Sequence, residues 1–278
     1  MGLLCQEIGA SVAVLLFPLV RSMGMVSLRL AFSALILLVF VRPRMRGYSR
    51  ADWGVAVAFG LVLAAMNAFF YFSLARLDLG AAVTIEVLGP LVLSVAASRR
   101  ASSWLWAALA LTGVVLLGLG GLGRLDPVGV AFAAAAGATG AGYILLSDRT
   151  GARFPKLDGL AIAMLAGTIV TLPFGIAATG PVLFDPVVLL LGLVVGALSS
   201  TIPYALELFA LRRLPNAVFA LLMSLAPAVA ALTGLVVLGQ EMTVVQAAAI
   251  GLVVVASAGA VRSGSAGGGS SEKELALP

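Results

Sequence analysis

Four charged residues stand inside long apolar stretches of this 278-residue chain: Glu7, Arg29, Glu86 and Glu207. A charge near the centre of a bilayer costs about 2.5–3.5 kcal/mol on insertion scales, so it normally faces a cavity or a charged partner. A carboxylate in such a place can hold a proton or an ammonium group, and a guanidinium can hold a carboxylate. These residue types therefore predict a site for a small zwitterion or a proton.

Glu86 is the strongest candidate of the four. It lies about seven residues, or about 10 Å of helix, from the nearer end of its apolar stretch, which is too deep for a short carboxylate to reach the interface comfortably. Pro90 follows at i+4, offers no N–H to the Glu86 carbonyl and predicts a kink there. A carboxylate beside freed backbone oxygens suits an ammonium group or a proton. The alternative is a purely structural pair with Arg29.

Arg29 and Glu207 each have two interpretations. Arg29 lies about one turn inside its predicted helix, so it either snorkels to the outer interface or turns inward to a substrate carboxylate or to Glu86. Glu207 lies on one helix face with Ser200, Pro203 and Tyr204, but it is also close enough to the helix end to be an interfacial carboxylate. Ser200 and its hydroxyl neighbours precede a helix-breaking proline, and such hydroxyls can line a cavity.

Asn67 and Tyr71 are one turn apart in the third predicted helix. A buried amide requires hydrogen-bond partners, so Asn67 is a candidate for substrate binding. Tyr71 is expected to belong to the aromatic belt at the outer interface. Gln6 and Glu7 lie close to Met1 and are expected to be in contact with water, unless the natural chain begins further upstream and places both near mid-membrane.

The composition defines the class of protein. Hydrophobic residues make up 62% and charged residues 10% of the chain, whereas a soluble domain carries roughly a quarter charged residues. Apolar runs of about 20 residues recur, and each can cross about 30 Å of hydrocarbon as a helix. We predict an all-α membrane protein with ten transmembrane helices, at residues 3–20, 26–41, 53–75, 79–98, 103–122, 127–147, 157–178, 186–211, 216–238 and 243–261. The Gly/Ser-rich segment 263–278 is predicted to be a disordered tail.

The basic residues predict the orientation of these helices. With the N-terminus in the cytoplasm, three arginines fall in outer connectors and thirteen basic residues fall on the inner side. The inner residues are Arg42, Arg44, Arg46, Arg50, Arg99, Arg100, Arg149, Arg153, Lys156, Arg212, Arg213, Arg262 and Lys273. We therefore expect a multi-pass membrane protein with both termini in the cytoplasm.

The chain contains an internal repeat. Residues 74–90 align without gaps with residues 211–227, and Pro90 matches Pro227. The repeat unit is five helices, and because five is odd the second copy must enter from the opposite face of the membrane. We predict two inverted five-helix repeats, residues 1–124 and 125–262, an architecture typical of transporters. Pro90, Pro203 and Pro227 are the expected hinges or kinks.

The residue inventory argues against several other functions. Cys5 is the single cysteine and histidine is absent, so the sequence predicts no metal site, and no cofactor motif stands in a usable context. The lack of any nucleophile–base pairing argues against a membrane enzyme. The net charge of +5 is scattered through short loops, which favours contact with lipid headgroups over nucleic acid.

Several segments together resemble the EamA-type members of the drug/metabolite transporter superfamily, and within it the subgroup that exports threonine and homoserine. The segments are FPLV…SLRLAFSALIL (17–37), MNAFFYFSL (66–74), IEVLGPL (85–91), LSSTIPYALELFALRRLP (198–215) and FALLMSLAPAVAALTGLVVLG (219–239). The resemblance covers nearly the whole chain. It implies ten helices, alternating access and export of small amino acids in exchange for protons, and it draws attention to Asn67, Glu86, Pro90, Pro203, Tyr204 and Glu207. Members of the subgroup carry a glutamate before the late-helix proline, where this chain has Ala226.

The leading hypothesis is thus a secondary exporter of small amino acids, with a proton as the second ligand and Glu86, Arg29, Asn67, Tyr204, Glu207 and Ser200 as binding residues. Efflux of another small metabolite or of a hydrophobic drug is the alternative, which the low aromatic content of 7% disfavours. A structural membrane scaffold would leave the buried carboxylates unexplained. A homodimer is left open.

Overall fold

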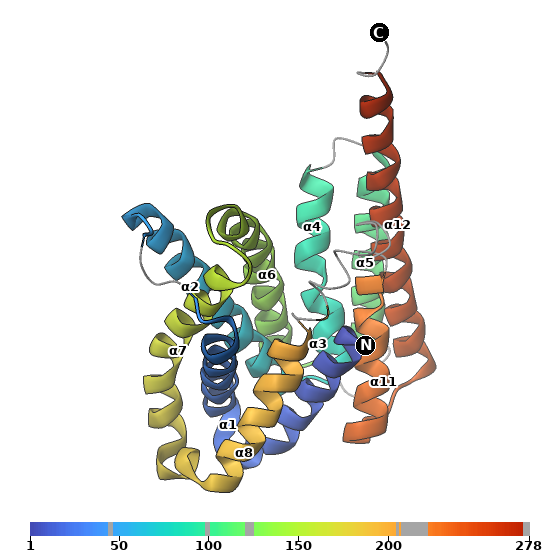
Figure 1. Cartoon of the computed structure of the whole chain (residues 1–278). Coiled ribbons are helices and arrows are strands. Elements are labelled where there is room, and N and C mark those ends of the chain that lie inside the picture. Colours follow the sequence, from blue (N-terminus) through green and yellow to red (C-terminus); the bar gives the residue numbers. More distant parts are fainter. Residues whose placement is uncertain (44–46, 98–100, 120–124, 204–205, 207–221, 275–278) are drawn as a thin grey trace.

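The chain folds into helices, and the computed structural model contains no strand among the residues that it describes (Figure 1). These are residues 1–43, 47–97, 101–119, 125–203, 206 and 222–274. The elements are α1 (Gly2–Val41), α2 (Arg50–Leu74), α3 (Leu79–Glu86), α4 (Leu88–Ala97), α5 (Ala101–Leu119), α6 (Pro127–Arg153), α7 (Asp158–Thr179), the 3-10 turn η1 (Gly180–Phe184), α8 (Pro186–Gly196), the π-helical turn η2 (Ala197–Thr201), α11 (Ala226–Leu238) and α12 (Val244–Glu274).

Within this described part, five helical stretches are long and apolar enough to cross a membrane. They are α1, α2, α6, the stretch Asp158–Phe184 and Val244–Arg262 within α12. Shorter apolar helices accompany them at Leu79–Leu93, Trp104–Gly118, Pro186–Thr201 and Ala226–Leu238. The prediction of an all-helical chain is therefore confirmed for the described residues, and five of its helical stretches are candidates to span a membrane.

The first two predicted helices are the two arms of α1. The backbone leaves helical geometry at Arg21, where φ is 52° and ψ is 169°. Pro18, three residues earlier, cannot donate a hydrogen bond within the helix. Glu7 and Arg29 would lie about 33 Å apart in a straight helix, yet both line one pocket. The two arms must therefore fold toward each other.

The helices pack in two groups (Figure 1). In one group α1 packs against α7 and α8, and α2 packs against α6 and α7; in the other α5 packs against α12, and α3 against α11. The groups meet where α3 and α4 contact α6 and where α11 contacts α1. The largest buried apolar cluster extends over α1, α2, α3, α6 and α7. The first arm of α1 thus lies at the junction of the two groups.

The predicted helix 79–98 is interrupted at Val87, between α3 and α4, close to the kink predicted at Pro90. Pro90 has no N–H for the carbonyl of Glu86. Helix α6 approaches this break closely, because a Cβ on Gly137 would lie 2.5 Å from the Glu86 carbonyl oxygen and one on Gly89 would collide with the Gly137 backbone. Glycine at both positions lets α6 pack directly on the interrupted backbone.

A similar interruption precedes α11. Residues 224–225 form a turn, α11 begins at Ala226, and Pro227 lies in its first turn. In the gapless alignment of residues 74–90 with 211–227, Pro227 corresponds to Pro90 and Ser224 to Val87. The helix is thus interrupted at the same aligned position in both segments.

Helix α12 extends to Glu274 and so includes much of the Gly/Ser-rich segment 263–278, for which the sequence predicts a disordered tail.

Candidate substrate-binding site

A pocket lies within the helical bundle where α1, α2 and α3 meet. It is lined by Gln6, Glu7 and Ala10 from the first arm of α1, Arg29 from the second arm, Met66, Asn67 and Phe70 from α2, and Glu86 from α3. Its empty volume is about 340 Å³, at the lower end of the roughly 300–1,000 Å³ of small-molecule sites. The pocket brings together Arg29, Asn67 and Glu86, three of the residues that the sequence predicts to bind substrate or a proton.

Arg29 is turned inward and is 6% exposed. Its Nε donates a hydrogen bond to Ser200 Oγ at 3.1 Å, its Nη2 to the Ser199 carbonyl at 3.0 Å, and its Nη1 to the Tyr71 hydroxyl at 3.3 Å. The guanidinium also lies 5.4 Å from the centre of the Tyr71 ring, within reach of a cation–π interaction. The alternative in which Arg29 snorkels to the interface is therefore wrong, because η2 and α2 hold its guanidinium in the interior.

The π-helical turn η2 supplies two of these contacts. A π-helical turn widens the helix by one residue and shifts the backbone carbonyls relative to the α-helical ladder. Here the Ser199 carbonyl and the Ser200 hydroxyl accept hydrogen bonds from Arg29, and the Gly196 carbonyl accepts one from Ser33 Oγ at 3.2 Å. Ser200, a predicted binding residue, thus holds Arg29 and is not among the residues that line the pocket.

Asn67 is 3% exposed, and its Nδ2 donates a hydrogen bond to the Leu63 carbonyl at 2.8 Å. This bond to its own helix fixes the amide at the pocket wall. Tyr71, one turn further on, is fully buried and accepts the hydrogen bond from Arg29. The expectation that Tyr71 belongs to an aromatic belt is wrong, because its hydroxyl is used inside the protein.

Glu7 is the charged residue of the pocket lining that the sequence did not predict to belong to the site. It is 2% exposed, so the expectation that it is in contact with water is wrong. Gly9, two residues later, packs against the backbone and side chain of Ser199, so the first arm of α1 lies tightly on η2. The signal for this contact was in the sequence, since a small residue within an apolar helix allows close approach of a neighbour. The closeness of Glu7 to Met1 concealed it.

The other predicted residues are distributed as follows. Tyr204 and Glu207 lie outside the residues that the structure describes. Pro203 is buried directly after η2, and Pro90 and Pro227 follow the two helix interruptions.

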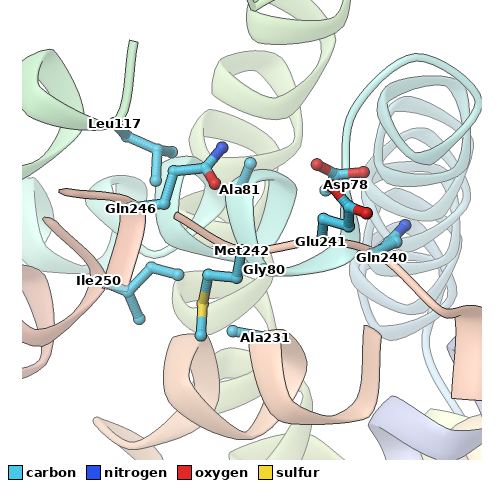
Figure 2. Close-up of a pocket in the computed structure, with 10 residues that line it drawn as sticks. All are labelled: Asp78, Gly80, Ala81, Leu117, Ala231, Gln240, Glu241, Met242, Gln246 and Ile250. Atoms are coloured by element: carbon cyan, nitrogen blue, oxygen red, sulfur yellow. The ribbon is translucent and has the colours of Figure 1, made fainter. Parts of the chain in front are cut away.

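A second pocket, with an empty volume of about 330 Å³, lies at the start of α3 and the connection between α11 and α12. Figure 2 shows Asp78, Gln240 and Glu241 on one side of it and Met242 and Ile250 on another. Gln240 Oε1 accepts a hydrogen bond from the Leu79 N–H at 3.1 Å and so satisfies the first turn of α3. Partial burial raises the pKa of Asp78 above its ordinary value. None of these residues is among those that the sequence predicts to belong to a binding site.

Apolar helices long enough to span a membrane, around an internal pocket that holds both carboxyl and guanidinium groups, define a membrane transporter. The sequence profile of the EamA-like transporter family matches residues 127–262. The chain is 40% identical over 253 residues to the threonine/homoserine exporter RhtA of Escherichia coli (strain K12) and to that of Salmonella typhimurium (strain LT2), covering 90% of this chain and 85% of each relative. The chain therefore belongs to the EamA family of transporters, as the sequence segments predicted.

Proposed function

We propose that this chain is a secondary transporter that exports small neutral amino acids of the threonine and homoserine type across a bacterial plasma membrane, by alternating access and in exchange for protons. The observation that carries the proposal is the internal pocket that combines Arg29, Asn67 and Glu86. The substrate class is supported by the two relatives, which are named as threonine/homoserine exporters.

The chemistry of the pocket fits a small zwitterion. The Glu86 carboxylate is the partner for the substrate ammonium group, since charge-assisted hydrogen bonds are strong away from bulk water. The fixed guanidinium of Arg29 makes its side of the pocket favourable for the substrate carboxylate. The amide of Asn67 offers a neutral polar group at the wall. The limited volume favours a small amino acid over a bulky hydrophobic drug.

The proposed architecture is ten transmembrane helices in two inverted repeats, residues 1–124 and 125–262, with both termini in the cytoplasm. Two observations support the repeat: the helix interruptions fall at the same aligned position in residues 74–90 and 211–227, and the family profile matches 127–262. The excess of basic residues in the predicted inner loops supports the orientation. In this arrangement the pocket opens alternately to the two sides as the two helix groups move relative to each other.

The experiment is counterflow in proteoliposomes containing the purified protein. Vesicles loaded with unlabelled threonine or homoserine should accumulate labelled threonine transiently, and vesicles loaded with aspartate or lysine should not. A pH gradient should drive threonine movement against its concentration gradient. The variant Glu86→Gln should lose transport at every pH, whereas Thr112→Ala, which removes an exposed hydroxyl on α5, should transport normally. Counterflow with none of a panel of amino acids would contradict the proposal.

A further inference from the structure

Glu7 lies in the same pocket as Glu86, on a different helix. It is 2% exposed, and its Oε2 has no hydrogen-bond partner among the described residues. Glu7 and Glu86 lie close enough to act on each other electrostatically, and Arg29 acts on both. A buried carboxyl oxygen without a partner is costly unless a proton or a ligand satisfies it. Glu7 is thus a polar group aimed at a cavity and in need of an occupant.

The charges of the pocket show what that occupant must be. Among the described lining residues, Glu7 and Glu86 are the acidic groups and Arg29 is the basic group, while Gln6 and Asn67 are neutral. Neighbouring α2 contributes the Tyr71 phenol and η2 contributes Ser199 and Ser200, which hold the guanidinium in place. Arg29 therefore balances one carboxylate and leaves one surplus negative charge. One monovalent cation restores neutrality.

Two such cations are available to an amino-acid exporter: a proton and the ammonium group of the substrate. Two neighbouring carboxyls disfavour the doubly ionised state and take up one proton as a pair. An ammonium group placed between them satisfies the same oxygens. The substrate carboxylate, paired with Arg29, leaves the two carboxyls to the ammonium group, and a proton uses the same carboxyl oxygens. Binding of either cation at the pair therefore excludes the other.

We propose that Glu7 is a second substrate-binding carboxylate, and that Glu7 and Glu86 form one site that holds either a proton or the substrate ammonium group, but not both. This inference rests on the proposed amino-acid export. The inward-facing pocket takes up substrate and releases its proton to the cytoplasm, and the outward-facing pocket takes up a proton and releases substrate. One substrate leaves for each proton that enters, and no bond to carbon changes.

The first test measures proton release from the detergent-purified wild-type protein when threonine or homoserine binds, in weakly buffered solution with a pH indicator. Release should approach one proton per amino acid bound in the pH range where the pair is protonated, and should fall toward zero at higher pH. Because it uses the unmodified protein, this test does not depend on the folding of a variant. Amino-acid binding without proton release at every pH between about 5 and 9 would overturn the shared site and leave amino-acid export standing. Failure to bind any amino acid would overturn both.

The second test compares Glu7→Gln with Glu7→Asp and with Asp185→Asn, which makes the same carboxyl-to-amide change at the N-cap of α8, outside the pocket. Glu7→Gln should weaken threonine binding by about tenfold, the effect of losing one charge-assisted hydrogen bond, and should abolish both proton release and the pH dependence of binding. Glu7→Asp should restore the pH dependence, and Asp185→Asn should resemble the wild type. If Glu7→Gln is folded by thermal melting and gel filtration and keeps wild-type proton release, Glu7 is structural and the proposal fails.

Discussion

The two helix interruptions of this transporter are alike in backbone and different in charge. The first separates α3 from α4 at Val87, and the second is the turn that precedes α11. A proline follows each at the same aligned position, but Glu86 at the first corresponds to Met223 at the second. The break is therefore a property of the architecture, whereas the carboxylate is an addition at one of the two places.

The two interruptions also differ in their immediate packing. At the first, Gly89 meets Gly137 of α6 so closely that neither position has room for a side chain. At the second, Ala226 occupies the position that aligns with Gly89. The first break thus leaves no room for a side chain at this position, whereas the second accommodates a methyl group. The close glycine contact with α6 belongs to the break that carries the carboxylate.

The largest loss of stability and export is expected when a side chain is placed at the contact between Gly89 and Gly137. Gly137→Val places side-chain atoms where the Glu86 carbonyl and the Gly89 backbone lie, and overpacking of this kind costs about 1–3 kcal/mol or more. The variant should show a lower melting temperature and export below about a tenth of wild type, measured by thermal melting in detergent and by counterflow. Gly140→Ala is the matched control on α6, because its Cβ would meet only the Met66 sulfur at 3.7 Å. Equal losses in both variants would mean that the close approach has no special role.

The next largest effect separates the charge from the break. Glu86→Met gives the first break the side chain of the second, so it should keep the melting temperature and lose export by at least about tenfold. Met223→Glu alone should lower the amount of protein in the membrane, since it adds a charge within an apolar segment at a residue that is not among those lining the pocket. The double variant should remain inactive. Recovery of export in the double variant would show that the two breaks are interchangeable and would refute the comparison.

A smaller effect is expected from the prolines themselves. Pro90→Ala supplies an N–H that can donate toward the Glu86 carbonyl, which favours a straighter helix. Pro227→Ala does the same at the second break, where no carboxylate has to be positioned. We expect Pro90→Ala to reduce counterflow several-fold and Pro227→Ala to reduce it less, with neither variant less stable by thermal melting. A larger loss in Pro227→Ala would show that the bend itself, and not the placement of Glu86, limits transport.

Sequence patterns predicted much of this molecule because a bilayer limits the choices. Length, apolar runs and the proline at 90 predicted the helices and the first break, and depth within an apolar run identified Glu86, Arg29 and Asn67. The sequence also predicted the two arms of α1 as separate helices, with residues 21–25 between them. Glu7 and Tyr71 were misjudged, because distance along the chain from a helix end does not reveal what packs against that end. Only the tertiary contact between Gly9 and η2 places Glu7 inside.

The smallest effect concerns the N-terminal end of α6, the helix that supports the first break. Asp126 accepts hydrogen bonds from the Val128 and Gly129 N–H groups at 2.8 and 3.4 Å and pairs with Arg76 at 2.9 Å. The hydrogen bond from Arg76 and those from the backbone hold the pKa of Asp126 below its ordinary value. The stabilisation is therefore present above the ordinary carboxyl range and is lost as the pH falls through the lowered pKa.

Because Asp126 and Arg76 are partly exposed, the ion pair should contribute little and the cap more. Asp126→Asn keeps an acceptor for the cap and should melt close to wild type, whereas Asp126→Ala should melt slightly lower at neutral pH. As the pH falls through the lowered pKa of Asp126, below the ordinary carboxyl value of about 3.9, the melting temperature of the wild type should approach that of Asp126→Asn, which has no titrating group at this position. Export by Asp126→Ala should change much less than export by Gly137→Val. Gly137, the residue of α6 that contacts the first break, lies about ten residues further along α6 than Asp126. An export defect as large as that of Gly137→Val would mean that α6 transmits strain from its end to the pocket, and that the first break is supported by the whole helix rather than by one close contact.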